Sequence, residues 1–243
     1  MGLRYSLLRT TCVLTGVFAL ACASCRRSLI ATLPSAPVRA ASVPNLYEAQ
    51  QQIEEYIRSG RYEEEVVKVL AAARAWLEER AKTAVEPAVV LDIDETSLSN
   101  WPAYRLNGWG RVLSGGCDLQ HGPCGLREWQ ELGQSNAIPP TLALARRARE
   151  LGVAVFFISA RPASLRKATA RNLKEQGYEW TDLILLPEGA QFASVVDFKA
   201  PERRKIAERG YTIILNIGDQ ESDLKGGYAE RTFKLPNPVY YLP

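Results

Sequence analysis

From about residue 46 onward, apolar and polar positions follow two alternating patterns. Stretches with apolar residues at helical spacing predict helices, at about 46–58, 62–81, 139–151, 162–176 and 201–209, with a short helix after Asp223. Short continuous apolar runs predict buried strands, at about 88–93, 153–159, 183–186, 211–217 and 231–235. Alternation of apolar strands with helices is typical of a parallel sheet covered on both faces. We therefore expect an α/β fold with a Rossmann-like parallel sheet and an N-terminal helical extension.

One long stretch, about residues 98–138, shows neither pattern and separates the first two predicted strands. It contains four large aromatic residues, namely Trp101, Tyr104, Trp109 and Trp129. These rings could stack on a nucleobase or an aryl leaving group. Alternatively, they pack the insertion against the N-terminal helices, and we expect packing for at least two of them.

The same stretch holds Cys117 and Cys124, which could close a small loop in an oxidising compartment. Metal chelation is the alternative. The chain has one histidine, His121, and no third cysteine nearby, which argues against zinc. A single histidine also closes off most Ser-His-Asp triads and phosphatase mechanisms that need two histidines. We expect His121 to be solvated or structural.

The first 25 residues have the pattern of a targeting segment. Arg4 and Arg9 precede an apolar run over 12–23, which is too short for a comfortable transmembrane span. Small residues surround Cys22 and Cys25, and either cysteine could be a lipoprotein processing site. An ordinary signal peptide cut at an Ala-x-Ala site is the alternative.

Residues 26–45 are rich in Ala, Ser and Pro and are expected to form a tether. The domain plan is therefore a signal peptide over 1–25, this tether, and one domain over 46–243. We expect an exported protein that is periplasmic or anchored to the membrane only through an N-terminal lipid.

Charge is unevenly distributed along the chain. Residues 1–41 contain five of the 30 Lys and Arg residues and no acid, so the remainder carries 25 basic and 27 acidic residues. This near-neutral remainder lacks the basic surface that polymeric nucleic acid requires. The composition therefore predicts no nucleic-acid polymer as a partner.

Reactive side chains follow three of the predicted strands, and a lysine precedes a predicted helix. In chain order they are Asp92 and Asp94, then Ser159, Ala160 and Arg161, then Lys199, then Asp219 and Asp223. Ligands of open α/β sheets bind at the carboxyl ends of the strands, so these groups should converge on one crevice. If the first strand extends to Ile93, Asp92 and Asp94 share a face and repel unless a cation or proton lies between them.

This order of motifs, with Thr96 after the second aspartate, resembles the haloacid dehalogenase superfamily of aspartate-nucleophile phosphatases. Residues 92–100 and 218–224 are similar to its exported acid phosphatases, which include bacterial class B and lipoprotein enzymes and plant vegetative-storage-type proteins. Residues 233–241 match the plant branch. The resemblance covers about 46–243 and is specific as a set, although each motif alone is weak.

The resemblance implies a Mg²⁺-dependent acid phosphatase that hydrolyses small phosphomonoesters, with 5′-nucleotides as candidates, through an aspartyl-phosphate intermediate. The insertion over 98–138 would be the cap that selects the substrate. A non-catalytic surface binding or storage protein on the same fold is the alternative.

The resemblance implies that Asp92 is the nucleophile and Asp94 the general acid and base. Phosphate would be bound by Ser159, Ala160 and Lys199, and the metal by Asp92, the backbone carbonyl of Asp94, and Asp219. The supporting residues would be Asp223, Thr96 and Arg161. Asp223 would support the metal shell or orient Lys199, and Thr96 would fix the turn. One departure is Ala160, since many relatives have Gly there. If this residue requires a positive φ, Ala would cost about 1 kcal/mol.

Overall fold

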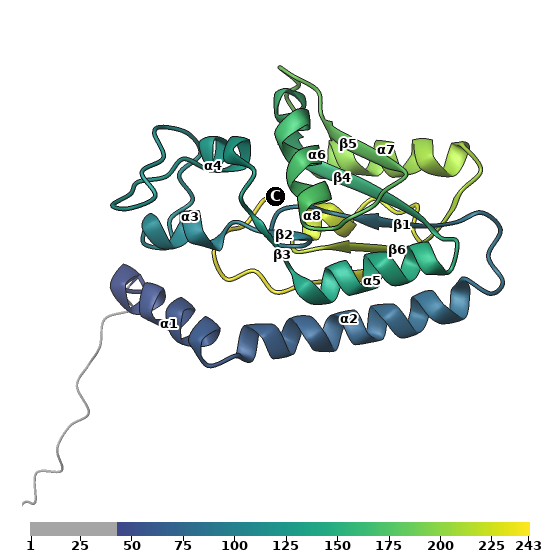
Figure 1. Ribbon diagram of the computed structural model, residues 1–243, viewed down its shortest axis with the longest axis horizontal. Helices are drawn as coiled ribbons and strands as arrows, with labels where there is room; N and C mark the ends of the chain where they lie inside the picture. Colours follow the sequence, from purple (N-terminus) through teal and green to yellow (C-terminus); the bar gives the residue numbers. More distant parts are fainter. Residues whose placement is uncertain (1–42) are drawn as a thin grey trace, which may run out of the picture. The chain divides into compact units, whose positions relative to one another are not determined.

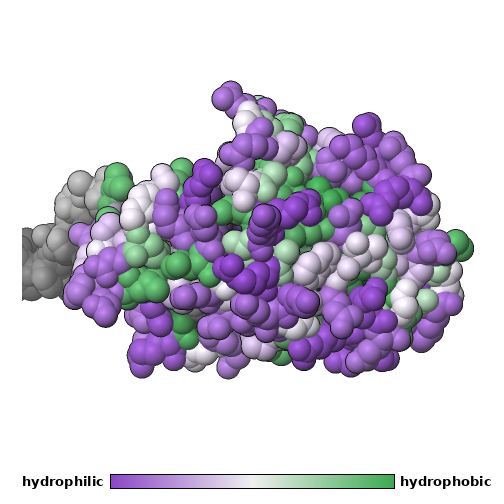
Figure 2. All heavy atoms as spheres, turned by 45° about the horizontal axis from the view of Figure 1, so that its top comes forward, coloured by the Kyte–Doolittle hydropathy of each residue, from purple (hydrophilic) through white to green (hydrophobic). Residues whose placement is uncertain are grey.

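The computed structural model describes residues 43–243, of which residues 44–243 form one compact unit (Figure 1). The predicted signal peptide, its candidate processing cysteines and nearly all of the predicted tether lie outside the described residues. No helix within 43–243 combines the length and apolar composition needed to cross a bilayer. Polar and charged residues cover most of the face seen in Figure 2, and apolar residues show between them.

A five-stranded parallel sheet forms the centre of this unit, in the order β5-β4-β1-β6-β7. The strands are β1 (Pro87–Leu91), β4 (Ala154–Pro162), β5 (Asp182–Leu186), β6 (Thr212–Gly218) and β7 (Thr232–Lys234). The long helices are α1 (Leu46–Arg58), α2 (Arg61–Arg80), α5 (Pro139–Glu150), α6 (Arg166–Glu175) and α7 (Val196–Glu208). The predicted α/β architecture is thus confirmed, with β1 at the middle of the sheet.

Alternate residues of β1 enter two different cores. Val89 and Leu91 belong to the larger core, to which α2 and α5 contribute. Ala88 and Val90 belong to the smaller core on the other face, with residues of α7. All four are essentially inaccessible to solvent. Burial of a Val or Leu side chain contributes about 1.5–3 kcal/mol, so both layers hold β1 in place.

The N-terminal extension is an integral layer of the domain. Leu70, Ala73 and Leu77 of α2 are buried in the larger core, because they recur at helical spacing on one face. The indole Nε1 of Trp76 donates a hydrogen bond to the carbonyl of Ile214 in β6, at 2.7 Å. Figure 1 shows α2 and α5 running alongside each other on the same side of the sheet.

The insertion after β1 is a small folded cap. Its base is closed by β2 (Leu98–Ser99) and β3 (Asn136–Ala137), which pair antiparallel, and it contains the short helices α3 (Trp101–Leu106) and α4 (Leu126–Leu132). The Cys117–Cys124 disulfide is present, which confirms that hypothesis. The structure therefore corrects the expectation of an irregular stretch: helices too short for a clear periodic pattern are formed here by packing.

The four aromatic residues of the cap pack within the protein. Trp101 lies against Tyr62 of α2, with 4.2 Å between ring centroids, and against Trp109 at 5.9 Å. Tyr104, Trp109 and Trp129 are buried in the larger core. All four therefore serve in packing, and Trp101 contacts the N-terminal helix α2 directly.

Several predicted boundaries were wrong. β4 continues to Pro162, so the helix predicted from 162 begins at Arg166 as α6. β1 ends at Leu91, two residues before the prediction, because the chain turns at Asp92; α7 begins at Val196, and Pro201 lies inside it. Proline is favoured in a first helical turn, which suggested a start at 201, but burial of Phe198 and Ala200 extends the helix backwards. The short helix α8 (Glu221–Leu224) begins before Asp223.

Candidate active site

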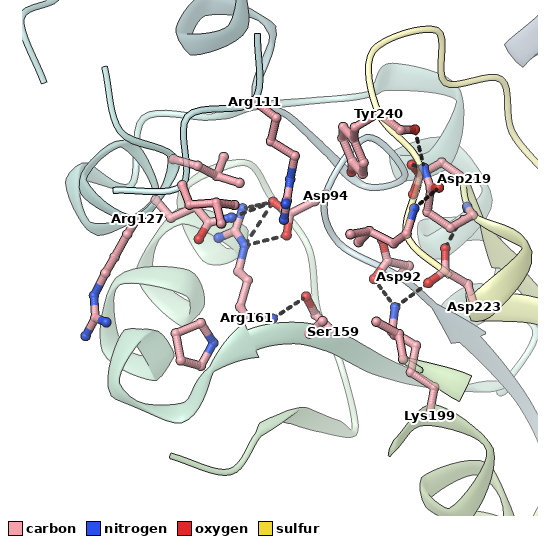
Figure 3. Close-up of a pocket in the computed structure, with 18 of the residues that line it drawn as sticks. Asp92, Asp94, Arg111, Arg127, Ser159, Arg161, Lys199, Asp219, Asp223 and Tyr240 are labelled. Carbon is pink, nitrogen blue, oxygen red and sulfur yellow. Dashed lines mark hydrogen bonds and ion pairs between the residues drawn. The ribbon is translucent and has the colours of Figure 1, made fainter. Parts of the chain in front are cut away.

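Lys199 connects two of the predicted site carboxylates. Its Nζ lies 2.5 Å from Oδ1 of Asp92 and 2.6 Å from Oδ1 of Asp223, and all three side chains are buried (Figure 3). Helix α7 supplies the lysine, the turn after β1 supplies Asp92, and α8 supplies Asp223. The structure thus brings together residues that are more than 100 positions apart.

Burial raises the pKa of the Asp92 carboxyl well above its ordinary value; the Lys199 ammonium opposes this, while the charges of Asp223, Asp219 and Asp94 add to it. Burial alone would lower the pKa of Lys199, but the charges of Asp223 and Asp92 and their hydrogen bonds outweigh burial and raise it. Lys199 is therefore a permanent cation at this site.

Asp219 lies beside Asp92 at the end of β6. Its Oδ2 accepts hydrogen bonds from Gln220 Nε2 and Asn237 Nδ2, both at 2.6 Å, and its Oδ1 accepts one from the Thr96 hydroxyl at 3.2 Å. Burial, and next the charge of Asp223, raise the pKa of Asp219 to about 7. Thr96 therefore acts on the site by orienting Asp219.

Carboxylate oxygens of Asp92, Asp219 and Asp223 lie within 4.8 Å of one another. These three buried acids have Lys199 as their neighbouring cation, and burial, together with the charge of Asp223, raises the pKa of Asp92 and Asp219. Mg²⁺ prefers oxygen ligands and one or two carboxylates with waters. The donor set therefore fits a divalent cation of this kind.

Three features hold Asp223 in place: a capping box, close contact with Gly218, and Arg203 of α7. Asp223 Oδ2 accepts the backbone N–H of Gln220 at 2.9 Å, which forms a capping box at the start of α8. A Cβ on Gly218 would come within 2.3 Å of the Asp223 Cβ, so only glycine fits there. The fully buried Arg203 of α7 donates to the carbonyl of Asp223 at 2.6 Å and of Gly227 at 2.9 Å.

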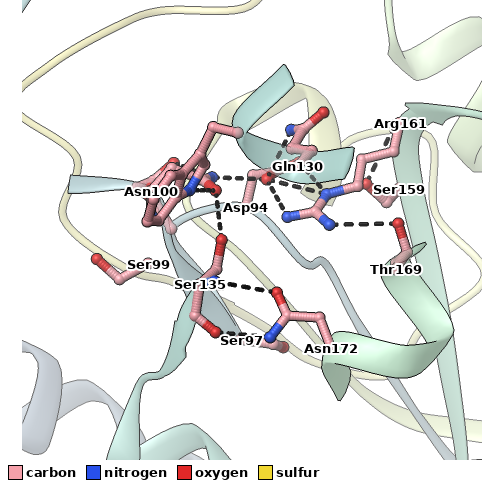
Figure 4. Close-up of polar contacts among 12 residues, drawn as sticks. Asp94, Ser97, Ser99, Asn100, Gln130, Ser135, Ser159, Arg161, Thr169 and Asn172 are labelled. Atoms are coloured by element: carbon pink, nitrogen blue, oxygen red, sulfur yellow. Dashed lines mark hydrogen bonds and ion pairs between the residues drawn. The ribbon is translucent and has the colours of Figure 1, made fainter. Parts of the chain in front are cut away.

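Asp94 points away from this group and is held by Arg161. Arg161 Nε lies 3.1 Å from both carboxylate oxygens of Asp94, and Nη2 lies 2.8 Å from Oδ1 (Figure 4). Asn100 Nδ2 and Gln130 Nε2 donate to the same Oδ1, at 2.6 and 3.0 Å. Burial would raise the pKa of Asp94, but the Arg161 charge and these hydrogen bonds hold it below its ordinary value.

The expectation that Asp92 and Asp94 share a strand face was therefore wrong. Because β1 ends at Leu91, neither residue is in the strand, and the chain turns between them. Each carboxylate has its own cation: Lys199 for Asp92 and Arg161 for Asp94. The pKa shifts have opposite directions: burial dominates at Asp92 and raises its pKa, whereas at Asp94 the Arg161 charge and the hydrogen bonds outweigh burial.

Asn100 connects Asp94 to the cap. Its Oδ1 accepts hydrogen bonds from Trp129 Nε1 at 3.1 Å and from the Ser135 hydroxyl at 3.0 Å. Ser135 in turn exchanges hydrogen bonds with Asn172 of α6, as Figure 4 shows. A continuous polar network thus runs from α6 through the cap to the Asp94 carboxylate.

Ser159 and Ala160 lie in β4 beside these acids. The Ser159 hydroxyl is buried and accepts the backbone N–H of Arg161 at 3.2 Å. Ala160 is not among the residues of 43–243 with a positive φ, so the condition for a strain cost at this position is not met. Ala160 therefore fits the strand without glycine's conformational freedom.

These groups line a cavity of about 320 Å³. Its walls include all the predicted acids, Ser159, Ala160, Arg161 and Lys199, with Thr96 behind Asp219. The cap contributes Arg111, Leu113, Leu126, Arg127 and Gln130, and the C-terminal segment contributes Tyr240 and Leu242. None of the four cap aromatics lines this cavity.

Tyr240 is the aromatic residue of this wall, and it is fixed on several sides. Its hydroxyl donates to Glu95 Oε2 at 3.2 Å, and its ring lies 5.8 Å from that of Tyr104. Glu95 is buried, and burial followed by the Asp94 charge raises its pKa to about 8. The guanidinium of Arg111 lies over the Tyr240 ring at 5.1 Å from its centroid.

Several residues of this site were missed in the sequence. Asn100 and Gln130, which hold Asp94, and Arg111, Asn237 and Tyr240 gave no local signal, because they lie on loops or short helices. The resemblance to known acid phosphatases covered three of them without assigning a role: Asn100 in residues 92–100, and Asn237 and Tyr240 in residues 233–241.

The sequence matches the model of the family "HAD superfamily, subfamily IIIB (Acid phosphatase)" over residues 19–243. Among curated relatives, it is 38% identical over 156 residues to vegetative storage protein 1 of Arabidopsis thaliana, and 34% identical over 155 residues to acid phosphatase 1 of Solanum lycopersicum. Each alignment covers 63% of this chain, with 55% of the first relative and 58% of the second. The chain thus spans little more than half the length of these relatives.

Among solved structures, the class C acid phosphatase from Bacillus anthracis with tungstate bound has a similar fold. The TM-score is 0.63 at 21% sequence identity, and the alignment covers 80% of this chain and 87% of that one. This likeness supports the parallel sheet and helix arrangement described above.

Proposed function

Because the chain belongs to the acid phosphatases of HAD superfamily subfamily IIIB, we propose that it hydrolyses small phosphomonoesters with Asp92 as the nucleophile. The observation that carries this proposal is the buried contact between Asp92 and Lys199 in a cavity also lined by Ser159. A nucleophilic carboxylate needs a fixed orientation and nearby cationic groups for the phosphoryl oxygens, and this arrangement offers both.

In the first step, an oxygen of Asp92 attacks phosphorus and the bond between phosphorus and the ester oxygen breaks. The leaving alkoxide takes a proton from Asp94, and an aspartyl-phosphate remains on Asp92. Lys199 and Ser159 hold phosphoryl oxygens and stabilise the charge that develops on them. Asp223 keeps Lys199 in position through its 2.6 Å contact.

In the second step, Asp94 takes a proton from water, whose oxygen attacks phosphorus. The bond to Asp92 breaks, which frees inorganic phosphate and restores the carboxylate. Arg161 favours the ionised form of Asp94, which suits this base step. Because Asp94 must carry a proton in the first step, its lowered pKa predicts an optimum at acid pH.

Asp92, Asp219 and Asp223 would hold a Mg²⁺ ion, together with the backbone carbonyl of Asp94. When bound, the ion supplies positive charge that favours ionised Asp92 and neutralises the incoming phosphate. The support for this proposal is the 4.8 Å grouping of the three acids.

A cavity of about 320 Å³ is at the low end of the range for small-molecule sites, which suits a small phosphomonoester. The nucleotide hypothesis depended on stacking by the cap aromatics, and those rings are engaged in packing. We therefore propose small phosphomonoesters as the substrate class and do not extend the proposal to nucleobase stacking on these rings.

We also propose that the protein is exported. Its support is the basic and apolar pattern of residues 1–25, together with the Cys117–Cys124 disulfide, which is typical of oxidising compartments.

A storage or binding protein that lacks turnover is the second candidate, because several relatives carry the name vegetative storage protein. Asp92, Asp94, Lys199 and Asp219 all remain buried or partly buried around the same cavity. This complete set favours the enzyme.

The test is hydrolysis of an aryl phosphate by wild type and Asp92→Asn across pH, with Mg²⁺ and with EDTA. We expect Asp92→Asn to lose at least about 10³-fold in kcat, because the nucleophile is gone. Asp118→Asn is the matched control, since Asp118 is an exposed acid of the cap outside the cavity.

Inactive wild-type protein with Mg²⁺ at every pH would favour the storage candidate. An Asp92→Asn variant as fast as the Asp118→Asn control would show that another group attacks phosphorus.

A further inference from the structure

The cavity contains four cations, and they fall into two pairs. Lys199 and Arg161 each contact an aspartate of the site at 2.8 Å or less. Arg111 and Arg127, both from the cap, form no ion pair within residues 43–243. The cations on the sheet side of this cavity are therefore paired with acids, whereas within residues 43–243 those on the cap side are not.

Arg111 is the better placed of the two cap arginines. It is half-buried, and its Nε has no hydrogen-bond partner among the described residues. Figure 3 shows its side chain reaching from the cap towards Asp94, the proposed proton donor to the leaving group. Arg127 is exposed, and its side chain makes one hydrogen bond within residues 43–243, to the Ser164 hydroxyl at 3.4 Å.

Packing holds Arg111 in position, and its donors have no hydrogen-bond partner in the part of the chain that the structure describes. Its guanidinium lies over the ring of Tyr240, at 5.1 Å from the centroid, and Tyr240 is itself fixed by Glu95 and Tyr104. A cation–π contact orients a guanidinium without using its N–H groups. A buried N–H without a partner costs free energy that a ligand acceptor would recover.

These observations point to a ligand with negative charge on the leaving-group side. The proposed phosphoryl site is served by Lys199, Ser159 and the acids of the metal group. The leaving alcohol would extend past Asp94 towards the cap, where Arg111 lies. An arginine with free donors is the side chain best suited to a planar carboxylate or a phosphate.

We propose that Arg111 is a specificity-determining residue that binds a second anionic group, a carboxylate or a phosphate, on the alcohol half of the substrate. This inference rests on the proposed function and defines its substrate class. An uncharged aromatic leaving group is less suited, because Arg111 covers one face of the Tyr240 ring.

The test uses three phosphate esters that differ only at the far end of the chain: propane-1,3-diol monophosphate, 3-phosphonooxypropanoate and propane-1,3-diol bisphosphate. The five-carbon equivalents extend the reach. We expect the wild-type kcat/KM for the carboxylate ester and for the bisphosphate to exceed that for the diol monophosphate by roughly tenfold or more, at one of the two chain lengths. The kcat/KM of the bisphosphate is divided by two, because either of its equivalent ends can react. Comparison of the carboxylate ester with the bisphosphate shows which anion is preferred.

Arg111→Gln should reduce this preference to near unity, whereas Arg111→Lys should retain part of it because the charge remains. Arg105→Gln is the matched control, since Arg105 is a cap arginine paired with Glu54 and outside the cavity. It should keep the full preference. Equal loss for all three esters in Arg111→Gln would assign Arg111 a structural role and overturn the inference.

Binding separates this inference from the proposed reaction. Calorimetric titration of Asp92→Asn with the same esters measures affinity without turnover, and should show the same preference and its loss with Arg111→Gln. If the esters bind with this preference but wild type hydrolyses none of them, the proposed reaction is wrong and the inference stands. If wild type hydrolyses and binds the esters without preference for the second anion at either chain length, the inference is wrong and the proposed reaction stands.

Discussion

Arg161 and Asp94 form a forked ion pair, with Nε 3.1 Å from both carboxylate oxygens and Nη2 2.8 Å from Oδ1. The Arg161 side chain is 1% exposed and that of Asp94 18% exposed, so solvent screens this pair only weakly. The same arginine also donates to the Thr169 hydroxyl at 3.2 Å. Arg161 is therefore a positioning residue for the proposed acid and base.

Replacement of Arg161 by Gln should move the pH profile upward. Without the guanidinium, burial dominates and the pKa of Asp94 rises. A higher pKa raises the pH at which Asp94 changes from a proton donor to a proton acceptor. We expect the optimum to rise by about one pH unit and kcat to fall by roughly tenfold or more.

The measurement is kcat and kcat/KM for an aryl phosphate between pH 4 and 8. Arg161→Lys keeps the positive charge but loses the two-nitrogen contact with the Asp94 carboxylate. Its pH–rate profile should therefore lie between those of wild type and Arg161→Gln. A profile of Arg161→Gln that overlays wild type, with only a lower rate, would show that Arg161 does not set the pKa of Asp94.

Lys199 should be required for both stability and activity. Its removal leaves Asp92 and Asp223 buried without their cation, and breaking a buried ion pair from one side costs about 3–5 kcal/mol. Lys199→Met should therefore unfold at lower urea concentration in EDTA. We also expect kcat/KM to fall by at least about 10²-fold, since charge stabilisation is lost.

Lys205→Met is the control for Lys199→Met, because Lys205 is on the same helix but pairs with Glu202 at the surface. Exposed pairs contribute about 0–1 kcal/mol, so this change should be small. Equal destabilisation by the two variants would contradict the central position given to Lys199.

The sequence predicted the elements of the sheet and the acids at its edge because both depend on local patterns. Apolar runs ending in Asp92 or Asp219 are visible without any tertiary information, and the edge of a parallel sheet brings them together. The exported location and the N-terminal processing sites stay predictions, because they fall on residues 1–42.

The partners of Asp94 could not be predicted in this way. Asn100 and Gln130 donate to it only because β2 and β3 close the cap and the Asn100–Ser135–Asn172 contacts hold it. For the same reason the sequence left open whether each cap aromatic stacks on substrate or packs inside the protein. The outcome depends on tertiary contacts such as that of Trp101 with Tyr62 of α2, because a sequence pattern does not encode which side of a short helix faces a cavity.

Mg²⁺ should stabilise the folded protein through the three-acid group. A ligand that binds only the folded state contributes about 2.7 kcal/mol at one hundred times its Kd. We expect Tm to rise when Mg²⁺ replaces EDTA, and Asp219→Asn to remove most of this rise. In EDTA at pH 8, Asp219→Asn should be at least as stable as wild type, because the pKa of about 7 shows that charge on buried Asp219 is unfavourable.

Thermal unfolding of both proteins at pH 8, with and without Mg²⁺, tests this crossover. Asp182→Asn is the control, since Asp182 forms a partly exposed pair with Arg209 away from the site. A Mg²⁺-dependent rise that survives in Asp219→Asn would place the cation elsewhere.

Glu95 should make the protein less stable as pH rises towards 8. Burial and the Asp94 charge raise its pKa from 4.5 to about 8 in the folded state. The folded protein therefore keeps a proton that the unfolded chain loses above pH 4.5. Stability from this group is complete below pH 4.5 and decreases up to pH 8, by at most about 1.4 kcal/mol per pH unit.

Glu95→Gln removes this titration, because the amide is neutral at every pH and still accepts the Asn100 N–H that lies 2.6 Å from Glu95 Oε1. Relative to wild type, the variant should gain stability between pH 5 and 7.5, as measured by urea unfolding in EDTA. Glu63→Gln, at an exposed position of α2, is the control, and its free energy of unfolding should depend on pH as that of wild type does. Parallel curves for Glu95→Gln as well would mean that Glu95 is ionised in the folded protein, and that its Tyr104, Tyr240 and Asn100 donors stabilise the carboxylate more than burial penalises it.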